Sequence, residues 1–136
     1  MLKVKSQIPN KEFVAFIHDW FELLAHGKLE EACQKIDKPN SYGITWTPEK
    51  IIEVVNDNFG PGTTYFLEHP EGPVFSNVSE TEGKFRADVI RFNDGSGYSV
   101  EHDLPLNKEW SDLTAQFEFI GGKREFEVIL HDIHVL

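Results

Sequence analysis

The pattern of apolar residues changes once along the chain, near Phe59 and Gly60. Before this point apolar residues recur every three or four positions, as in helices, and after about Val74 they alternate, as in strands. A chain that places its helices first and its strands last is typical of an α+β domain. We therefore expect an α+β fold in which three N-terminal helices pack in the concave face of a curved antiparallel sheet.

The first part of the chain predicts helices over about residues 10–26, 29–36 and 48–59. Asn10 is expected to cap the first helix, and Gly27 to end it in the left-handed conformation that glycine adopts without strain. Thr47-Pro48 is a favourable start for the third helix, because proline suits the first helical position.

The second part predicts long strands over residues 84–92, 97–104, 112–120 and 125–135. The turn sequences Asn93-Asp94-Gly95-Ser96 and Gly121-Gly122-Lys123-Arg124 lie between them and indicate two hairpins. Two shorter strands are expected around residues 65–68 and 74–78. Together these segments predict an antiparallel meander.

The last strand does not keep one period. Phe126, Val128 and Leu130 share one face, whereas Ile133 and Val135 fall on the other. A β-bulge near His131-Asp132 would return both sets to the core, and bulges are common where a sheet bends and beside functional sites.

Length and charge limit the classes of function. The 136 residues fit one domain, residues 1–136, with no room for two ordinary cores. The net charge is −10, with 9 acids and 7 bases in residues 1–60 but 14 acids and 6 bases in residues 61–136. This balance opposes binding to nucleic acid or to an anionic membrane, and it favours a basic partner at the strand half, or only a solvated surface.

The apolar segments and the cysteine content of the chain bear on its cellular location. It contains no 18-residue apolar run, and its N-terminus has no apolar stretch of the secretory kind. The single cysteine, Cys33, excludes an intramolecular disulfide. We expect a cytoplasmic protein.

Three residues of the strand half are candidates for catalysis. His102 shares a strand face with Tyr98 and Leu104, so it points toward the core, as a pocket base or as a core histidine. Asp132 and His134 lie at the expected bulge, where a carboxylate beside an imidazole could act as an acid–base pair. Structural or surface roles for these residues are the alternative, and a metal site is a weaker one.

Other residues are candidates for the lining of a pocket, and each has a structural alternative. Asp19 lies in the first helix, and Arg91 falls on the apolar face of its strand; both could instead point to solvent. Trp46 and Trp110 lie near turns and could form a pocket mouth or fill the core, as could Tyr98. The chain has no glycine-rich nucleotide loop, no Gly-x-Ser-x-Gly and no His-Glu-x-x-His, so we expect no cofactor and no metal.

The order of these elements resembles the NTF2-like (cystatin-like α+β cone) superfamily over nearly the whole chain. The stretches Trp110-Ser111-Asp112-Leu113-Thr114-Ala115 and Leu130-His131-Asp132-Ile133-His134-Val135-Leu136 resemble segments of small uncharacterised bacterial NTF2-like proteins. The resemblance implies an α+β cone. Its members include isomerases, dehydratases, cyclases and non-enzymatic binding modules, so it implies no single activity.

Two functions follow as hypotheses. The first is a non-enzymatic binding module that acts through its acidic sheet half or its cone pocket, either on a basic protein, for example in neutralising a toxin, or as a homodimer. The second is a binder or enzyme for a small apolar molecule, of the isomerase, dehydratase or cyclase type, that uses His102, Asp132 and His134. The second requires that His102 and Asp132 open into one shared cavity.

Overall fold

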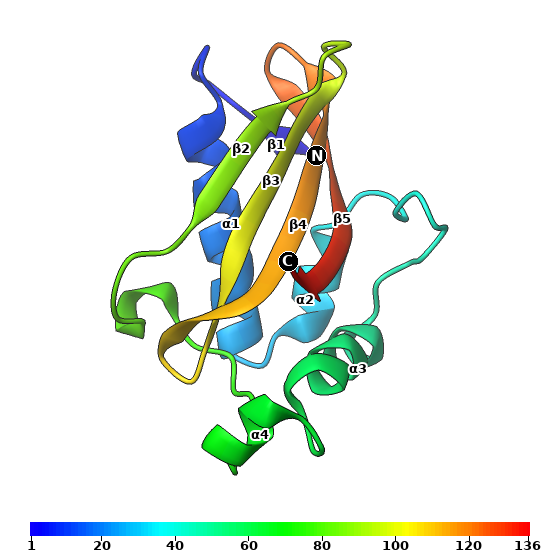
Figure 1. Ribbon diagram of the computed structural model, residues 1–136. Helices are drawn as coiled ribbons and strands as arrows, with labels where there is room; N and C mark the ends of the chain where they lie inside the picture. Colours follow the sequence, from blue (N-terminus) through cyan, green and yellow to red (C-terminus); the bar gives the residue numbers. More distant parts are fainter.

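The computed structural model describes residues 1–136 and has the expected α+β organisation. Four helices and a 3₁₀ turn precede four long strands, and a short strand lies at the N-terminus (Figure 1). In chain order, the elements are β1 (Leu2–Lys3), α1 (Asn10–Ala25), α2 (Leu29–Gln34), α3 (Pro48–Phe59), α4 (Thr64–Glu68), η1 (Val78–Glu80), β2 (Ala87–Arg91), β3 (Gly97–Leu106), β4 (Glu109–Gly122) and β5 (Glu125–Val135).

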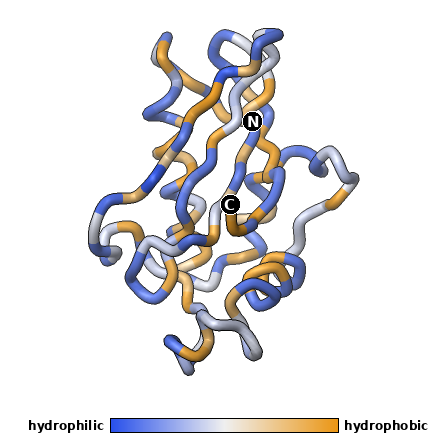
Figure 2. The backbone as a smooth tube through the Cα atoms, viewed as in Figure 1, coloured by the Kyte–Doolittle hydropathy of each residue, from blue (hydrophilic) through white to orange (hydrophobic).

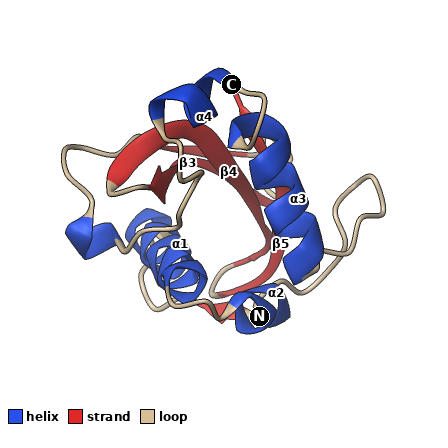
Figure 3. Cartoon of the chain, turned by 90° about the horizontal axis from the view of Figure 1, so that it is seen from below, coloured by secondary structure: helices blue, strands red, loops and turns tan.

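The strands form one antiparallel sheet in the order β1-β5-β4-β3-β2. The sheet is curled into a half-barrel, and the helices lie on its concave side, so that its convex side has no helix over it (Figures 1 and 3). Two register irregularities contribute to the curvature, one between Asp103 and Pro105 in β3 and one opposite Gln116 and Phe117 of β4.

The core lies between α1 and the concave face of the sheet. Phe13 of α1 stacks on Phe119 of β4 with ring centroids 4.2 Å apart, and Trp20 packs edge-on against Phe117 at 5.1 Å. The side chains of all four residues are buried. Hydrophobic and hydrophilic residues alternate along the strands, as Figure 2 shows. The aromatic residues of α1 and β4 therefore hold the helix on the sheet.

The end of α1 and the beginning of α3 agree with the predictions from the sequence. Gly27 has φ of 74°, and the amides of Gly27 and Lys28 donate to the carbonyls of Leu24 and Leu23. This is the Schellman arrangement that satisfies the last carbonyls of a helix. Thr47 caps α3, because its hydroxyl accepts from the amide of Lys50.

Three local predictions were wrong. Asn10 is the first residue of α1 rather than its cap, and Glu12 instead accepts the amides of Lys5 and Ser6. Residues 65–68 form the helix α4 instead of a strand, because the hydroxyl of Thr63 accepts from the amide of Phe66 and starts a helical turn. Residues 74–78 contain only an isolated bridge and the beginning of η1.

The predicted bulge in the last strand is confirmed. Gln116 pairs with Asp132 but Phe117 pairs with Leu130, so His131 is the extra residue of β5. As a result both Leu130 and Ile133 are buried. The two carbonyls at the bulge do not stay unpaired, since the Trp46 indole donates to that of Leu130 at 2.7 Å and the Asn40 amide to that of His131 at 2.9 Å.

The turn between β3 and β4 contains two residues with strained backbone conformations. Asn107 and Lys108 both have positive φ, 52° and 64°, a conformation that costs a lysine about 1 kcal/mol. We expect Lys108→Gly to raise the free energy of unfolding by roughly 0.5–1 kcal/mol, as urea denaturation would measure. Asn107→Gly is the matched control. It should destabilise the fold, because the Asn107 side chain bonds to Val74 and Tyr65.

Candidate functional site

The three candidates for catalysis lie on opposite faces of the sheet. His102 is fully buried on the concave face, in register with Ala115, which pairs with Ile133. Asp132 and His134 lie on the convex face, with His134 Nδ1 3.0 Å from Asp132 Oδ2. The backbone of the sheet separates the two groups. The structure therefore does not bring His102 and Asp132 into one shared cavity.

His102 contacts His18, a histidine that was not among the site residues predicted from the sequence. Its Nδ1 donates to the carbonyl of Asp103 at 2.7 Å, and its Nε2 lies 2.9 Å from Nε2 of His18 on α1. Since Nδ1 carries the proton in neutral His102, Nε2 is the acceptor and His18 the donor. Burial lowers the pKa of His102 to about 4 and also lowers the pKa of His18.

Aromatic rings surround this histidine pair. Phe85 stacks on His102 with centroids 4.7 Å apart, and Phe21 packs against its edge at 5.2 Å. Trp110 lies 5.6 Å from His102, and its indole N–H is buried without a hydrogen-bond partner. The structure thus brings together two residues that the sequence had singled out separately, His102 as a candidate for catalysis and Trp110 as a candidate for a pocket mouth. However, the His102 Nε2 lone pair faces His18. The two histidines therefore form a packed polar contact, and His102 is not a base aimed at a ligand.

The remaining pocket candidates lie apart from one another. Trp46 is buried and fills the core instead of a pocket mouth, and Tyr98 packs against Phe13 with centroids 5.1 Å apart. Asp19 is exposed beside Trp20 in a small hollow of about 230 Å³. Arg91 is exposed at the end of β2. These residues therefore do not form one pocket.

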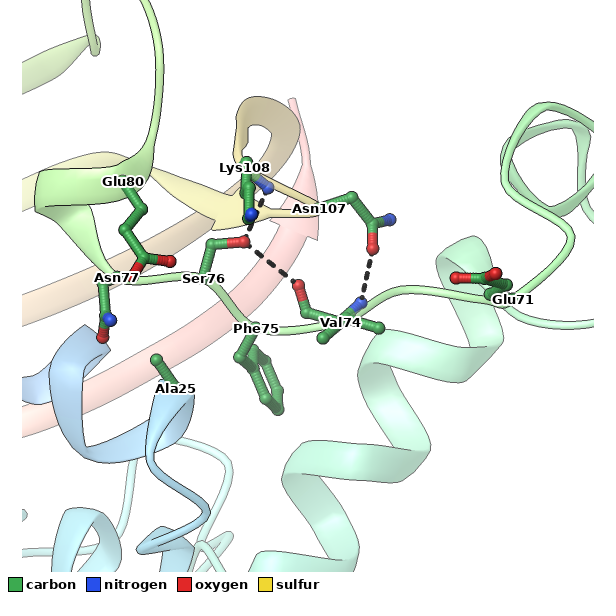
Figure 4. Close-up of a pocket in the computed structure, with 9 residues that line it drawn as sticks. All are labelled: Ala25, Glu71, Val74, Phe75, Ser76, Asn77, Glu80, Asn107 and Lys108. Atoms are coloured by element: carbon green, nitrogen blue, oxygen red, sulfur yellow. Dashed lines mark hydrogen bonds between the residues drawn. The ribbon is translucent and has the colours of Figure 1, made fainter.

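One cavity lies where no candidate was predicted. It has a volume of about 430 Å³ and is formed by the end of α1, the segment after α4, η1 and the β3–β4 turn. Figure 4 shows the residues that line it: Ala25, Glu71, Val74, Phe75, Ser76, Asn77, Glu80, Asn107 and Lys108. The available sequence signal was the irregular stretch of residues 63–81, which contains Pro70, Gly72 and Pro73.

The polar groups of this cavity are mostly occupied by each other. The Ser76 hydroxyl accepts from the amide of Lys108 at 2.6 Å, and Asn107 Oδ1 accepts from the amide of Val74 at 3.2 Å (Figure 4). Asn77 Oδ1 is buried and has no partner. The cavity therefore presents one buried free acceptor together with the carboxylates of Glu71 and Glu80, an arrangement suited to holding a polar group.

The convex face of the sheet is strongly acidic. Its outward positions form rows across the strands, such as Asp88, Glu101, Gln116 and Asp132. The carboxylates on this face include Asp88, Glu101, Asp103, Asp112, Glu118, Glu127 and Asp132. No helix covers them (Figure 1).

Two long cationic side chains pair with these carboxylates: Lys38 lies 3.0 Å from Glu127, and Arg86 contacts three of the others. Arg86 lies just before β2, and its guanidinium is 2.7 Å from Asp88, 3.5 Å from Asp103 and 3.9 Å from Glu101. One positive charge offsets at most one of these three carboxylates. The convex face therefore keeps an excess of negative charge, which sequence reasoning had assigned only to the strand half as a whole.

The fold and its surfaces define a small α+β domain with a curled sheet and an open acidic face, in which the predicted pair Asp132 and His134 forms on the convex face, away from His102. The family model of a domain of unknown function, DUF7668, matches residues 21–136, so the chain belongs to this family. No curated protein and no solved structure matches the chain. None of its helices has the length and the apolar character needed to cross a membrane.

Proposed function

We propose that the protein is a non-enzymatic binding module whose convex sheet face binds a basic surface of a partner protein. The observation that carries the proposal is the uncovered acidic face, where Arg86 is ion-paired with Asp88 and Asp103 and further carboxylates remain in excess. Charges of one sign on an open surface steer and orient a partner of the opposite sign.

The domain is also proposed to be a member of the NTF2-like superfamily and to work in the cytoplasm. The helices-first order and the curled antiparallel sheet support the first part, and the acidic composition with a single cysteine supports the second. Neutralisation of a basic toxin is one role that such a surface would serve. The enzymatic alternative has no support from geometry, because His102 and Asp132 lie on opposite faces of the sheet.

The binding proposal makes a prediction that two charge variants can test. The first variant removes four carboxylates of the convex face: Glu101→Gln, Asp112→Asn, Glu118→Gln and Asp132→Asn. The second removes four exposed carboxylates from helices α2, α3 and α4: Glu31→Gln, Glu53→Gln, Asp57→Asn and Glu68→Gln. Both variants therefore have the same net charge.

Each tagged protein is used to capture partners from a lysate of the source organism at low and at high salt. We expect wild type and the helix variant to retain one basic protein at low salt. The convex-face variant should capture about tenfold less of this protein than wild type does. High salt should release it from wild type and from the helix variant. Equal capture by the two variants would contradict the proposal, because net charge alone would then explain the binding.

A further inference from the structure

The open edge of the sheet has unpaired backbone groups. β2 is the last strand in the sheet, and nothing pairs with its free side. The amide of Phe92 donates to the carbonyl of Gly97, and the carbonyl of Arg86 accepts from the amide of Asp103. The backbone N–H and C=O groups of the even-numbered residues of this segment therefore point toward β3. By the alternation of an antiparallel ladder, the N–H and C=O groups of Ala87, Val89 and Arg91 point away from the sheet. Such an edge is a template for another strand.

An apolar groove runs beside this edge. It has a volume of about 440 Å³ and lies between β2 and the first half of α1; its lining residues are Asn10, Lys11, Val14, Phe85, Ala87 and Val89. Figure 1 shows β2 at the margin of the sheet with α1 behind it. A strand added to β2 would project every second side chain toward this groove.

The two ends of the groove differ in chemistry. Phe13 of α1 packs against Tyr98, the register partner of Arg91, so Lys11, which lines the groove, and Arg91, which lies just beyond its lining on β2, are at the same end. Both cations are exposed and neither takes part in an ion pair. At the other end, Phe85 is 40% exposed and packs edge-on against His18. One end is thus cationic and the other aromatic.

We propose that this groove binds an extended segment of a partner polypeptide as an additional antiparallel strand on β2. An antiparallel segment enters at the Arg91 end, so its N-terminal residue is acidic, and apolar residues follow at every second position. This is strand addition with pockets for alternate side chains. The carboxylate is recognised by Lys11 and Arg91. The groove is on the concave side, so this site is separate from the acidic convex face.

A second copy of β2 fits the groove less well. In a symmetric antiparallel pair centred on Val89, Arg91 of the copy would lie opposite Ala87, on the face that looks into the apolar groove. A guanidinium placed there would lose water without gaining a carboxylate. Charge complementarity therefore favours an acidic segment over self-association.

Three synthetic peptides test the proposal: acetyl-ETVTVT-amide, acetyl-KTVTVT-amide and the reversed acetyl-TVTVTE-amide. In the first, glutamate lies opposite Arg91 and the valines lie opposite Val89 and Ala87. Titration into ¹⁵N-labelled protein should shift the amide signals of these three residues. We expect the glutamate peptide to bind about fivefold tighter than the other two, the effect of an exposed ion pair.

Two variants assign the effect to the groove. Lys11→Ala with Arg91→Ala should remove the fivefold preference while leaving the core untouched. Val89→Pro removes an outward N–H without breaking the β2–β3 ladder, and should abolish the binding that Val89→Thr retains.

Three outcomes would overturn the proposal. They are unchanged signals for the edge amides at millimolar peptide, equal binding of all three peptides, and shifts of the same amides with protein concentration alone, which would identify a second copy as the occupant. If the edge amides stay unchanged while signals of the convex face shift, the proposed function still stands.

Discussion

Replacing Phe13 by alanine is expected to lower the free energy of unfolding by about 3–5 kcal/mol. Phe13 is fully buried and contacts three aromatic rings, those of Phe119 at 4.2 Å and of Phe126 and Tyr98 at 5.1 Å each. The loss combines the transfer free energy of the ring with a cavity between α1 and the sheet, because neighbouring rings relax only in part. Such a loss is a large share of the roughly 5–15 kcal/mol that stabilises most domains.

Urea denaturation followed by tryptophan fluorescence measures this effect. The matched control is Phe16→Ala, because Phe16 lies on the same helix but is only partly buried. Phe16→Ala should lower the free energy of unfolding clearly less than Phe13→Ala does. An equal loss for both variants would contradict the assignment of Phe13 as the central contact between α1 and the sheet.

The second large effect is a dependence of stability on pH. Burial lowers the pKa of His102 to about 4 in the folded protein, from 6.5 when exposed. Between these values the unfolded chain binds a proton that the folded protein does not. Stability from neutral His102 is therefore complete above pH 6.5 and is lost as pH falls toward 4. The difference corresponds to about 3 kcal/mol.

The measurement compares the free energy of unfolding of wild type and His102→Gln from pH 7 to pH 4. Wild type should lose about 3 kcal/mol more than the variant over this range. His18→Gln keeps His102 buried and should retain most of the dependence. Parallel pH curves for wild type and His102→Gln would show that His102 ionises as readily in the folded protein as in the unfolded chain.

The sequence predicted those features that depend on local periodicity. The change from helical spacing to alternation gave the α+β class, and the break of period between Leu130 and Ile133 gave the bulge at His131. The inward direction of His102 also followed from alternation. In contrast, α4 was missed because a threonine cap decided between helix and strand in a short segment.

The candidate site was less predictable because its contacts are distant in sequence. His18 and His102 are separated by 84 positions, and no local pattern pairs them. The bulge that returns Ile133 to the core also turns Asp132 and His134 to the convex face, away from His102. The contacts of Arg86 with Glu101 and Asp103 likewise depend on the register of β2 and β3.

A photo-crosslinking experiment in cells of the source organism tests most directly whether the convex face binds a basic protein. A photoreactive amino acid replaces Gln116, which lies at the centre of the convex face between Glu101 and Asp132. The control carries it at Asp57 of α3, an exposed position far from that face. We expect a covalent adduct with a basic protein from position 116, which is absent from position 57 and is lost when the convex-face carboxylates are neutralised. No adduct from position 116, or the same adduct from both positions, would contradict this expectation.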